Sequence, residues 1–316
     1  MSELARLVVI VGPTASGKSA LGIELARRLG GEILVCDSTQ VYRHFDIGTG
    51  KVPAAEQRGV RHHLVDLVEP EEVFTAGEYR RRALEVLDDL RRRGRLPIIT
   101  AGTGLYLRAL LEGLAELPER SEPLRDRLRR RAAKRGPLYL YHLLGRIDQE
   151  AAARLAPRDT QKVIRAIEIR KLAGKPIGDV RRAGRTALAG FQIRKIGLAP
   201  PREALYARIH ARVGAMIEAG WLDEVRGFIA QGLSADAKPF QFIGYSDLHA
   251  RLVRSSQAGP DSLADVISRI EQATRQFSKR QVTWFRKEPD VHWLFGFGDE
   301  PGVQAQALVL AQAEKR

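Results

Sequence analysis

The N-terminal third of the chain alternates between short apolar runs and longer amphipathic stretches. Three apolar runs have the length of a strand, at residues 7–11, 33–36 and 97–101, and a weaker candidate spans residues 63–67. Continuous runs of this kind are typical of strands buried on both faces of a parallel sheet. Between them the pattern predicts helices over 19–29 and 75–93, each followed directly by glycine. This alternation indicates an α/β fold, in which a parallel sheet carries helices on both faces.

The pattern changes after residue 117. Residues 118–190 have helical periodicity with Gly and Pro breaks, which predicts an inserted helical lobe. The remaining pattern predicts a strand over 193–198, helices over about 202–219, 222–231 and 261–286, and a helix or tail in the last dozen residues. We therefore expect a core formed by residues 1–117 and 191–316, with the lobe 118–190 inserted into it.

Composition narrows the class of protein. Hydrophobic residues make up 44% of the 316, which favours a folded globular chain. The single cysteine excludes an internal disulfide and any zinc site built from several cysteines. No apolar run approaches the length of a membrane span, and the N-terminus lacks the pattern of a secretory signal. We expect a cytoplasmic protein without a membrane segment, and a monomer, since nothing in the sequence indicates an obligate assembly.

Positive charge is concentrated in the predicted lobe. The chain carries a net charge of +14. Residues 119–200 contain 21 Lys and Arg against 8 Asp and Glu, an excess of 13. An arginine-rich composition alone would spread this charge more evenly along the chain. The concentration favours a polyanionic partner that binds the lobe.

A phosphate-binding loop follows the first predicted strand. The segment fits the pattern G-x-x-x-x-G-K-[ST] at every position, between a strand and a helix, and consists of Gly12, Pro13, Thr14, Ala15, Ser16, Gly17, Lys18 and Ser19. Backbone N–H groups and the helix N-terminus attract phosphate, the lysine bridges phosphate oxygens, and the Ser19 hydroxyl is a ligand for Mg²⁺. The motif indicates a di- or triphosphate ligand, and an ATPase, a nucleotide kinase and a diphosphate-dependent transferase all remain open.

Two polar residues follow other strands of the predicted sheet. Asp37 comes directly after the run 33–36, and Thr103 follows the run 97–101. Because ligands bind at the carboxyl ends of parallel strands, both side chains are expected near the phosphate loop. Spacing leaves open whether Asp37 caps a helix, binds magnesium, or accepts a proton from a nucleophile.

Eight segments, in this order, resemble the motifs of the bacterial tRNA dimethylallyltransferase (isopentenyltransferase) family. They span residues 12–19, 37–43, 46–51, 62–66, 102–106, 159–168, 243–245 and 273–286. The resemblance implies that dimethylallyl diphosphate donates its five-carbon group to N6 of the adenosine just 3′ of the anticodon, adenosine-37. It also implies that residues 12–19 hold the donor's diphosphate with Mg²⁺. Asp37 would then accept a hydrogen bond or a proton from N6, and Thr103 would help to position the substrate.

The same resemblance implies a set of residues that bind the anticodon stem-loop of tRNA. Asp159 is a plausible N-cap of a helix in the lobe, and that helix would present polar side chains to RNA. The implied tRNA-binding residues are Asp37, Ser38, Thr39, Gln40, Thr103, Arg125, Gln161, Lys162, Val163, Ile164 and Arg165.

Three alternatives share some of these features. An adenylate isopentenyltransferase, which modifies free nucleotides, would need the phosphate loop and Asp37 but has less need of a basic lobe. A nucleotide kinase would need an arginine-rich lid, which the run 119–135 could mimic, but it leaves the segment 273–286 unexplained. A non-catalytic RNA-binding protein would have no need of an intact loop with Lys18 and Ser19.

Overall fold

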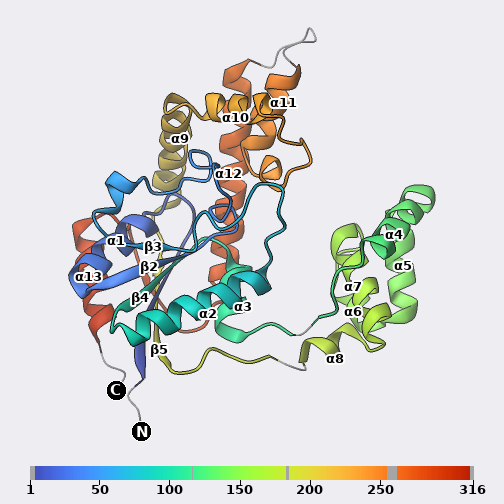
Figure 1. Ribbon diagram of the computed structural model, residues 1–316, viewed down its shortest axis with the longest axis horizontal. Coiled ribbons are helices and arrows are strands. Elements are labelled where there is room, and N and C mark those ends of the chain that lie inside the picture. The colour runs from blue at the N-terminus through green and yellow to red at the C-terminus, as the bar shows by residue number, and fades with distance from the viewer. Residues whose placement is uncertain (1–3, 116, 183–184, 255–261, 314–316) are drawn as a thin grey trace. The chain divides into compact units, whose positions relative to one another are not determined.

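A six-stranded sheet forms the centre of the protein. The computed structural model describes residues 4–115, 117–182, 185–254 and 262–313. The strand order is β3-β2-β4-β1-β5-β6, and every pairing is parallel (Figure 1). The strands are β1 (Ala5–Val11), β2 (Gly31–Cys36), β3 (His62–His63), β4 (Leu96–Ala101), β5 (Phe191–Leu198) and β6 (Val291–Leu294). The predicted α/β fold with a parallel sheet is confirmed.

Helices cover both faces of this sheet. On one face, α1 (Lys18–Leu29) and α13 (Pro301–Gln312) pack against alternate strand residues such as Val8 and Ile10. On the other face lie α2 (Ala76–Arg92) and α3 (Gly104–Glu112) (Figure 1). The Tyr79 ring of α2 stacks on the Tyr106 ring of α3. Because both faces are covered, β1, β2 and β4 are apolar almost throughout, which explains the continuous runs in the sequence.

A second helical layer adjoins the carboxyl ends of the strands. It contains α9 (Arg202–Glu218), α10 (Trp221–Ala230), α11 (Tyr245–Arg254) and α12 (Leu263–Phe285), which share a core around Trp221. Ser262 and Asp265 form a capping box that starts α12. The predicted helix start at Asp261 lies outside the described residues. Two short 3₁₀ helices, η1 (Ala54–Gln57) and η2 (Lys238–Gln241), complete this part of the chain.

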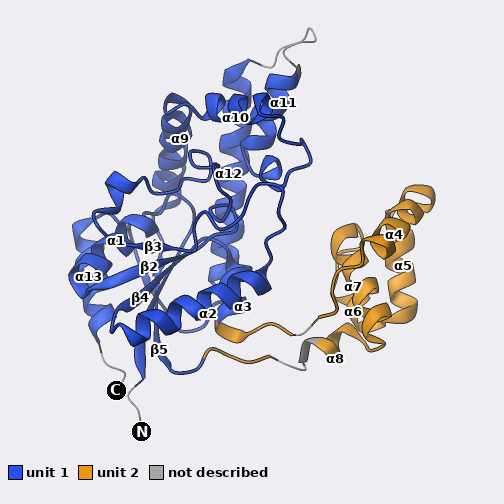
Figure 2. Ribbon diagram, in the orientation of Figure 1, with its two compact units in different colours: residues 1–110, 189–316 blue, residues 111–188 orange. Residues whose placement is uncertain are grey.

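The chain divides into two compact units (Figure 2). Unit 1 comprises residues 1–110 and 189–316, and unit 2 comprises residues 111–188. Unit 2 is helical, and its own apolar core is built around α7. Its helices are α4 (Glu122–Arg135), α5 (Pro137–Ile147), α6 (Gln149–Ala153), α7 (Thr160–Ala173) and α8 (Ile177–Arg182). The observed unit begins seven residues before the expected boundary at 118 and ends two residues before 190.

Several elements differ from the sequence prediction. The strand expected over 63–67 is limited to β3, because Leu64 and Asp66 adopt left-handed backbone conformations that end it. Helices α3 and α11 and strand β6 were not predicted. The C-terminal helix α13 is part of the fold, since Val303 and Ala307 are buried against α1. No helix among the described residues is long and apolar enough to cross a membrane.

Candidate active site

The phosphate loop joins β1 to α1 at the point where the order of the strands reverses. Gly17 caps α1 with a left-handed backbone conformation (φ +85°) and no side-chain cap, so the first N–H groups of the helix stay available to an anion. The Ser16 hydroxyl is buried and has no hydrogen-bonding partner within the described residues. An unpartnered donor at the start of a helix is the expected geometry of a phosphate site whose ligand satisfies it.

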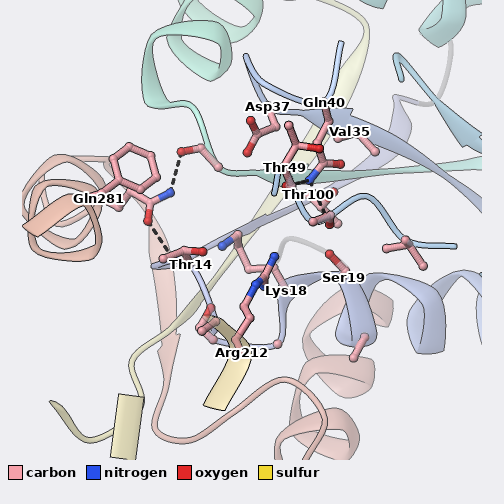
Figure 3. A pocket seen from close by; sticks show the side chains of 18 of the residues that line it. Thr14, Lys18, Ser19, Val35, Asp37, Gln40, Thr49, Thr100, Arg212 and Gln281 are labelled. Carbon is pink, nitrogen blue, oxygen red and sulfur yellow. Dashed lines mark hydrogen bonds between the residues drawn. The ribbon is translucent and has the colours of Figure 1, made fainter. Parts of the chain in front are cut away.

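A pocket opens above this loop (Figure 3). The space between its walls is about 800 Å³, counting the open solvent at its mouth. The predicted residues Thr14, Ala15, Ser16, Gly17, Lys18 and Ser19 line it together with Asp37 and Gln40. Gly12 and Pro13 do not line it, although Lys18 Nζ donates to the Pro13 carbonyl at 2.8 Å. The loop and Asp37 are therefore brought together as the sequence predicts.

Two cations meet at the base of the pocket. Lys18 extends from the start of α1, and Arg212 reaches the same pocket from α9 (Figure 3). Burial lowers the pKa of Lys18 to about 8, Asp37 opposes this shift, and Arg212 adds to it. Burial also lowers the pKa of Arg212. A cationic, partly desolvated pair of this kind is suited to a multiply charged anion such as diphosphate.

The pKa of Lys18 predicts a pH dependence of donor binding. A cationic Lys18 attracts an anionic ligand, so affinity is highest below pH 8 and falls as the pH rises through about 8, where the free protein loses this proton. Titration with dimethylallyl diphosphate at pH 6.8–9.5, without metal, measures this effect. The ligand's own last phosphate proton leaves near pH ~6, below this range. A dissociation constant that stays flat, or one equally pH-dependent in Lys18→Met, would contradict the prediction.

Asp37 presents one oxygen to the pocket. Its Oδ1 accepts hydrogen bonds from the Thr39 backbone N–H at 2.9 Å and the Thr39 hydroxyl at 2.7 Å. Its Oδ2 has no hydrogen-bonding partner within the described residues and lies against Gly102, where any added Cβ would overlap it. One oxygen thus orients the carboxylate, and the other is available to accept a proton or a hydrogen bond from a ligand.

Gly102→Ala is expected to lower turnover by displacing this carboxylate. The added methyl would overlap Oδ2, and a misplacement of about 1 Å costs on the order of 10²-fold in rate. Gly214→Ala in α9 is the matched control, because no atom lies near its added Cβ. Steady-state turnover of both variants tests the effect. Equal rates for Gly102→Ala and Gly214→Ala would show that the position of Asp37 is not critical.

Thr103 lies beside Asp37 but does not line the pocket. Its hydroxyl accepts from the Ser38 backbone N–H at 2.9 Å and donates to the Ser38 hydroxyl at 3.2 Å. It therefore fixes the residues that follow Asp37. Gln40, predicted with Ser38 and Thr39 to bind RNA, lines the pocket and donates to the Thr49 carbonyl at 3.2 Å. Contacts of these four residues with RNA stay a prediction.

Gln281 is a pocket residue that the sequence analysis did not single out. It lies on α12, where its Oε1 accepts from the Thr14 N–H at 2.7 Å and its Nε2 donates to the Gly102 carbonyl at 2.9 Å. It is buried and joins the phosphate loop to the end of β4 (Figure 3). Arg212 was missed as well. Gln281 falls inside the segment 273–286, but its distance of 267 residues from Thr14 hid this contact.

The chain beyond β6 supports the phosphate loop from its other side. Gly298 N–H donates to the Ser16 carbonyl at 2.9 Å, and neither Gly17 nor Gly298 has room for a Cβ. Asp299 pairs with Arg208 through two contacts of 2.6 Å. The loop is therefore held on both sides before any ligand binds.

The predicted RNA-binding segment of unit 2 forms the first turns of α7. Asp159 caps this helix, as predicted, by accepting from the Lys162 N–H at 3.2 Å. Gln161 and Lys162 are exposed. Val163 and Ile164 have 0% and 1% exposure and lie in the core of unit 2. The prediction that these two residues contact RNA does not hold for their side chains, which are not accessible.

Arg125 and Arg165 are engaged inside unit 2. Both approach Glu168, which is fully buried, with Arg165 Nη1 at 2.6 Å and Arg125 Nε at 3.8 Å from its Oε2. Arg165 also donates to the Pro118 carbonyl at 2.9 Å. Removing either arginine would leave the buried carboxylate short of a partner. A loss of RNA binding in such a variant could therefore come from a lost RNA contact or from a less stable unit 2, and the variant does not separate the two causes.

Comparisons with known proteins identify the family of the chain. Residues 40–288 match the family model described as IPP transferase. The chain is 47% identical over 304 residues to the tRNA dimethylallyltransferase of Solibacter usitatus, covering 96% of each chain. It is 48% identical over 302 residues to that of Koribacter versatilis, again covering 96% of each.

Solved structures give the same assignment. The tRNA isopentenylpyrophosphate transferase of Bacillus halodurans matches with a TM-score of 0.69 and 34% identity, covering 97% of each chain. A eukaryotic dimethylallyltransferase acting on tRNA matches with a TM-score of 0.80 and 26% identity, covering 96% of this chain and 78% of that one. The chain belongs to the IPP transferase family, which includes the tRNA dimethylallyltransferases.

Proposed function

We propose that this protein transfers a dimethylallyl group from dimethylallyl diphosphate to N6 of adenosine-37, 3′ of the anticodon in tRNA. The observation that carries the proposal is a single pocket that contains both an anion site and a proton acceptor. Lys18, Arg212 and the loop amides form an anion site, and Asp37 Oδ2 faces it with no partner within the described residues. A transferase that releases diphosphate and deprotonates an amine needs both.

The proposed reaction uses these groups in a single displacement. The bond between the allylic carbon and the diphosphate oxygen breaks, and a bond from N6 to that carbon forms. Negative charge that builds on the departing diphosphate is stabilised by Lys18, Arg212 and the loop amides. The N6 proton passes to Asp37 Oδ2, because an exocyclic amine of low basicity attacks better when its proton is accepted.

We propose Mg²⁺ as the cofactor of the same pocket. Ser19 lines it, and its hydroxyl would hold the ion. A site with one hydroxyl ligand leaves the other positions to phosphate oxygens and water, as Mg²⁺ prefers. Bound there, the ion would neutralise charge on the diphosphate.

Similarity over the whole chain favours tRNA over a free nucleotide as acceptor. The relatives named tRNA dimethylallyltransferases match 96% of the chain, which includes unit 2. Unit 2 also presents basic side chains, with Arg127, Arg130 and Arg131 all exposed on α4. An enzyme acting on free AMP, or a nucleotide kinase, does not account for this combination.

Binding of tRNA is expected to weaken steeply with salt. Each phosphate contact from Lys or Arg contributes about −0.7 to −0.9 to the slope of log K against log salt concentration. Arg127→Gln, Arg130→Gln and Arg131→Gln together should make this slope shallower and leave donor affinity unchanged. Arg226→Gln, an exposed arginine of α10 paired with Asp223, is the control. Filter binding between low and moderate salt measures the slopes, and a flat response in the wild type would contradict RNA binding through this surface.

A single incubation tests the proposed acceptor atom. The protein is mixed with dimethylallyl diphosphate, Mg²⁺ and an anticodon stem-loop that carries adenosine-37, and the RNA is digested to nucleosides for mass spectrometry. Dimethylallyladenosine should form, and a stem-loop with guanosine at that position should give none. Modification of the guanosine-containing RNA, or of neither RNA, would exclude the proposed reaction.

A further inference from the structure

The segment that follows Phe45 is held by side chains that lie outside the pocket. Glu224 Oε2 accepts from the backbone N–H groups of Asp46 at 3.1 Å and Ile47 at 2.9 Å. Glu224 Oε1 accepts from the Tyr245 hydroxyl at 2.5 Å, and that hydroxyl accepts from the Gly48 N–H at 3.0 Å. Three consecutive amides are thus bound by one carboxylate of α10 and one phenol of α11.

Aromatic packing also holds the Tyr245 hydroxyl against the segment 46–48. The Trp221 ring lies directly against Gly48 and Gly244, where an added Cβ would overlap its indole. The Tyr245 ring meets Trp221 edge-on at 5.4 Å and lies 4.9 Å from the Phe45 ring. The hydroxyl of Tyr245 is therefore aimed at the segment 46–48 by an aromatic cluster with little freedom to move.

The next two residues belong to the pocket. Thr49 and Gly50 both line it, and the Arg212 guanidinium lies so close to Gly50 that an added Cβ would overlap Nη2. Gln40 Nε2 donates to the carbonyls of Thr49 and Gly50 at 3.2 and 3.4 Å. Thr49 and Gly50 form one wall of the pocket. The placement of the amides 46–48 consequently decides the position of this wall and how far the Arg212 side chain extends into the pocket.

The two ends of the segment are anchored independently of Glu224. Phe45 is fully buried in the core of the second helical layer. Lys51 Nζ contacts the Tyr42 carbonyl at 2.6 Å, Asp46 Oδ1 at 2.7 Å and Asp66 Oδ1 at 2.5 Å. Loss of the contacts to Glu224 should therefore shift residues 46–50 locally and leave the chain on either side in place.

We propose that Glu224 and Tyr245 are positioning residues for the diphosphate pocket. They act through the amides 46–48 on Thr49, Gly50 and Arg212, and touch no substrate themselves. The inference rests on the proposed donor function of this pocket. Three amides that converge on one carboxylate–phenol pair replace a flexible loop with a preformed wall, which lowers the cost of ordering the pocket when the donor binds.

Two conservative variants test the proposal. Glu224→Gln replaces one acceptor oxygen with an NH₂ group, which cannot accept a hydrogen bond from an N–H group, and Tyr245→Phe keeps the ring but removes the hydroxyl. Each should raise the dissociation constant for dimethylallyl diphosphate about tenfold, as expected for the loss of about 1.4 kcal/mol. The KM for tRNA should stay unchanged. The double variant should lose less binding free energy than the two single losses added together, because the two residues share a hydrogen bond.

Asp223→Asn is the matched control, since this exposed neighbour on α10 pairs with Arg226 and with no other side chain in the described part of the chain. It should bind the donor as the wild type does. Donor affinity that is unchanged in Glu224→Gln and Tyr245→Phe, with a lower melting temperature alone, would overturn the inference and assign these residues to stability. A wild-type protein that binds no dimethylallyl diphosphate would overturn the proposed donor together with the inference.

Discussion

Asp37→Asn is expected to lower kcat by about 10³-fold while the affinity for dimethylallyl diphosphate stays near that of the wild type. The asparagine amide matches the carboxylate in size and still accepts from Thr39 through one oxygen. At the position of Oδ2 it places an NH₂ group, which cannot accept a proton from the attacking amine. The loss therefore falls on the chemical step.

Single-turnover rates and calorimetric titration with the donor separate the two effects. Asp88→Asn, an exposed aspartate of α2 paired with Arg91, controls for the change in net charge. If Asp37→Asn instead weakened donor binding in proportion to its loss of rate, the carboxylate would act on the diphosphate side, through magnesium. The assignment of Asp37 as proton acceptor would then have to be abandoned.

Lys18→Met is expected to reduce kcat/KM for the donor by about 10² to 10³-fold. Methionine keeps most of the length of the side chain but removes the cation from the proposed diphosphate site. In the proposed reaction Lys18 would contact the diphosphate both before and during its departure, so KM should rise and kcat should fall together. Arg212→Gln should act in the same direction, and the double variant should lose less than the two single losses combined, because both cations stabilise one leaving group.

Lys238→Met, a change at an exposed lysine in η2, is the control for this series. Steady-state kinetics with the donor varied at saturating tRNA give both constants. Turnover in Lys18→Met close to that of the wild type would mean that the leaving diphosphate is not held by the phosphate loop. The proposed orientation of the donor, with its diphosphate at the phosphate loop, would then be wrong.

Features of the chain that depend on neighbours in sequence were predictable. The phosphate loop needs eight consecutive residues between a strand and a helix, and the structure has them there. Asp37 follows β2 directly, and parallel strands place their carboxyl ends on one edge, which brings it to the loop. The continuous apolar runs identified β1, β2 and β4 because these strands are buried on both faces.

Features that depend on distant contacts were not predictable in the same way. Arg212 is one of 52 Lys and Arg residues, and nothing next to it in the sequence distinguishes it. The role of Glu224 depends on amides 177 and 178 residues earlier in the chain. The strand β6 has four residues and joins the edge of the sheet beside β5, so its apolar run is too short to be separated from a loop.

The assignment of Val163 and Ile164 to RNA binding shows a different limit. Both belong to a segment that resembles a functional motif, yet apolar residues recur along α7 at 163, 164, 166, 167 and 169 and are buried. This spacing predicts a helix enclosed by its neighbours, and it was available from the sequence. A motif contains residues that build its helix as well as residues that meet a ligand.

The most direct test of the account is the acceptor of the dimethylallyl group. Purified protein is incubated with radiolabelled dimethylallyl diphosphate and Mg²⁺, in parallel with unmodified tRNA and with AMP. The account predicts label in tRNA and none in AMP, and a far slower entry of label into tRNA with Asp37→Asn. Label in AMP alone would contradict it and identify a free-nucleotide enzyme, for which the basic surface of unit 2 would need another explanation.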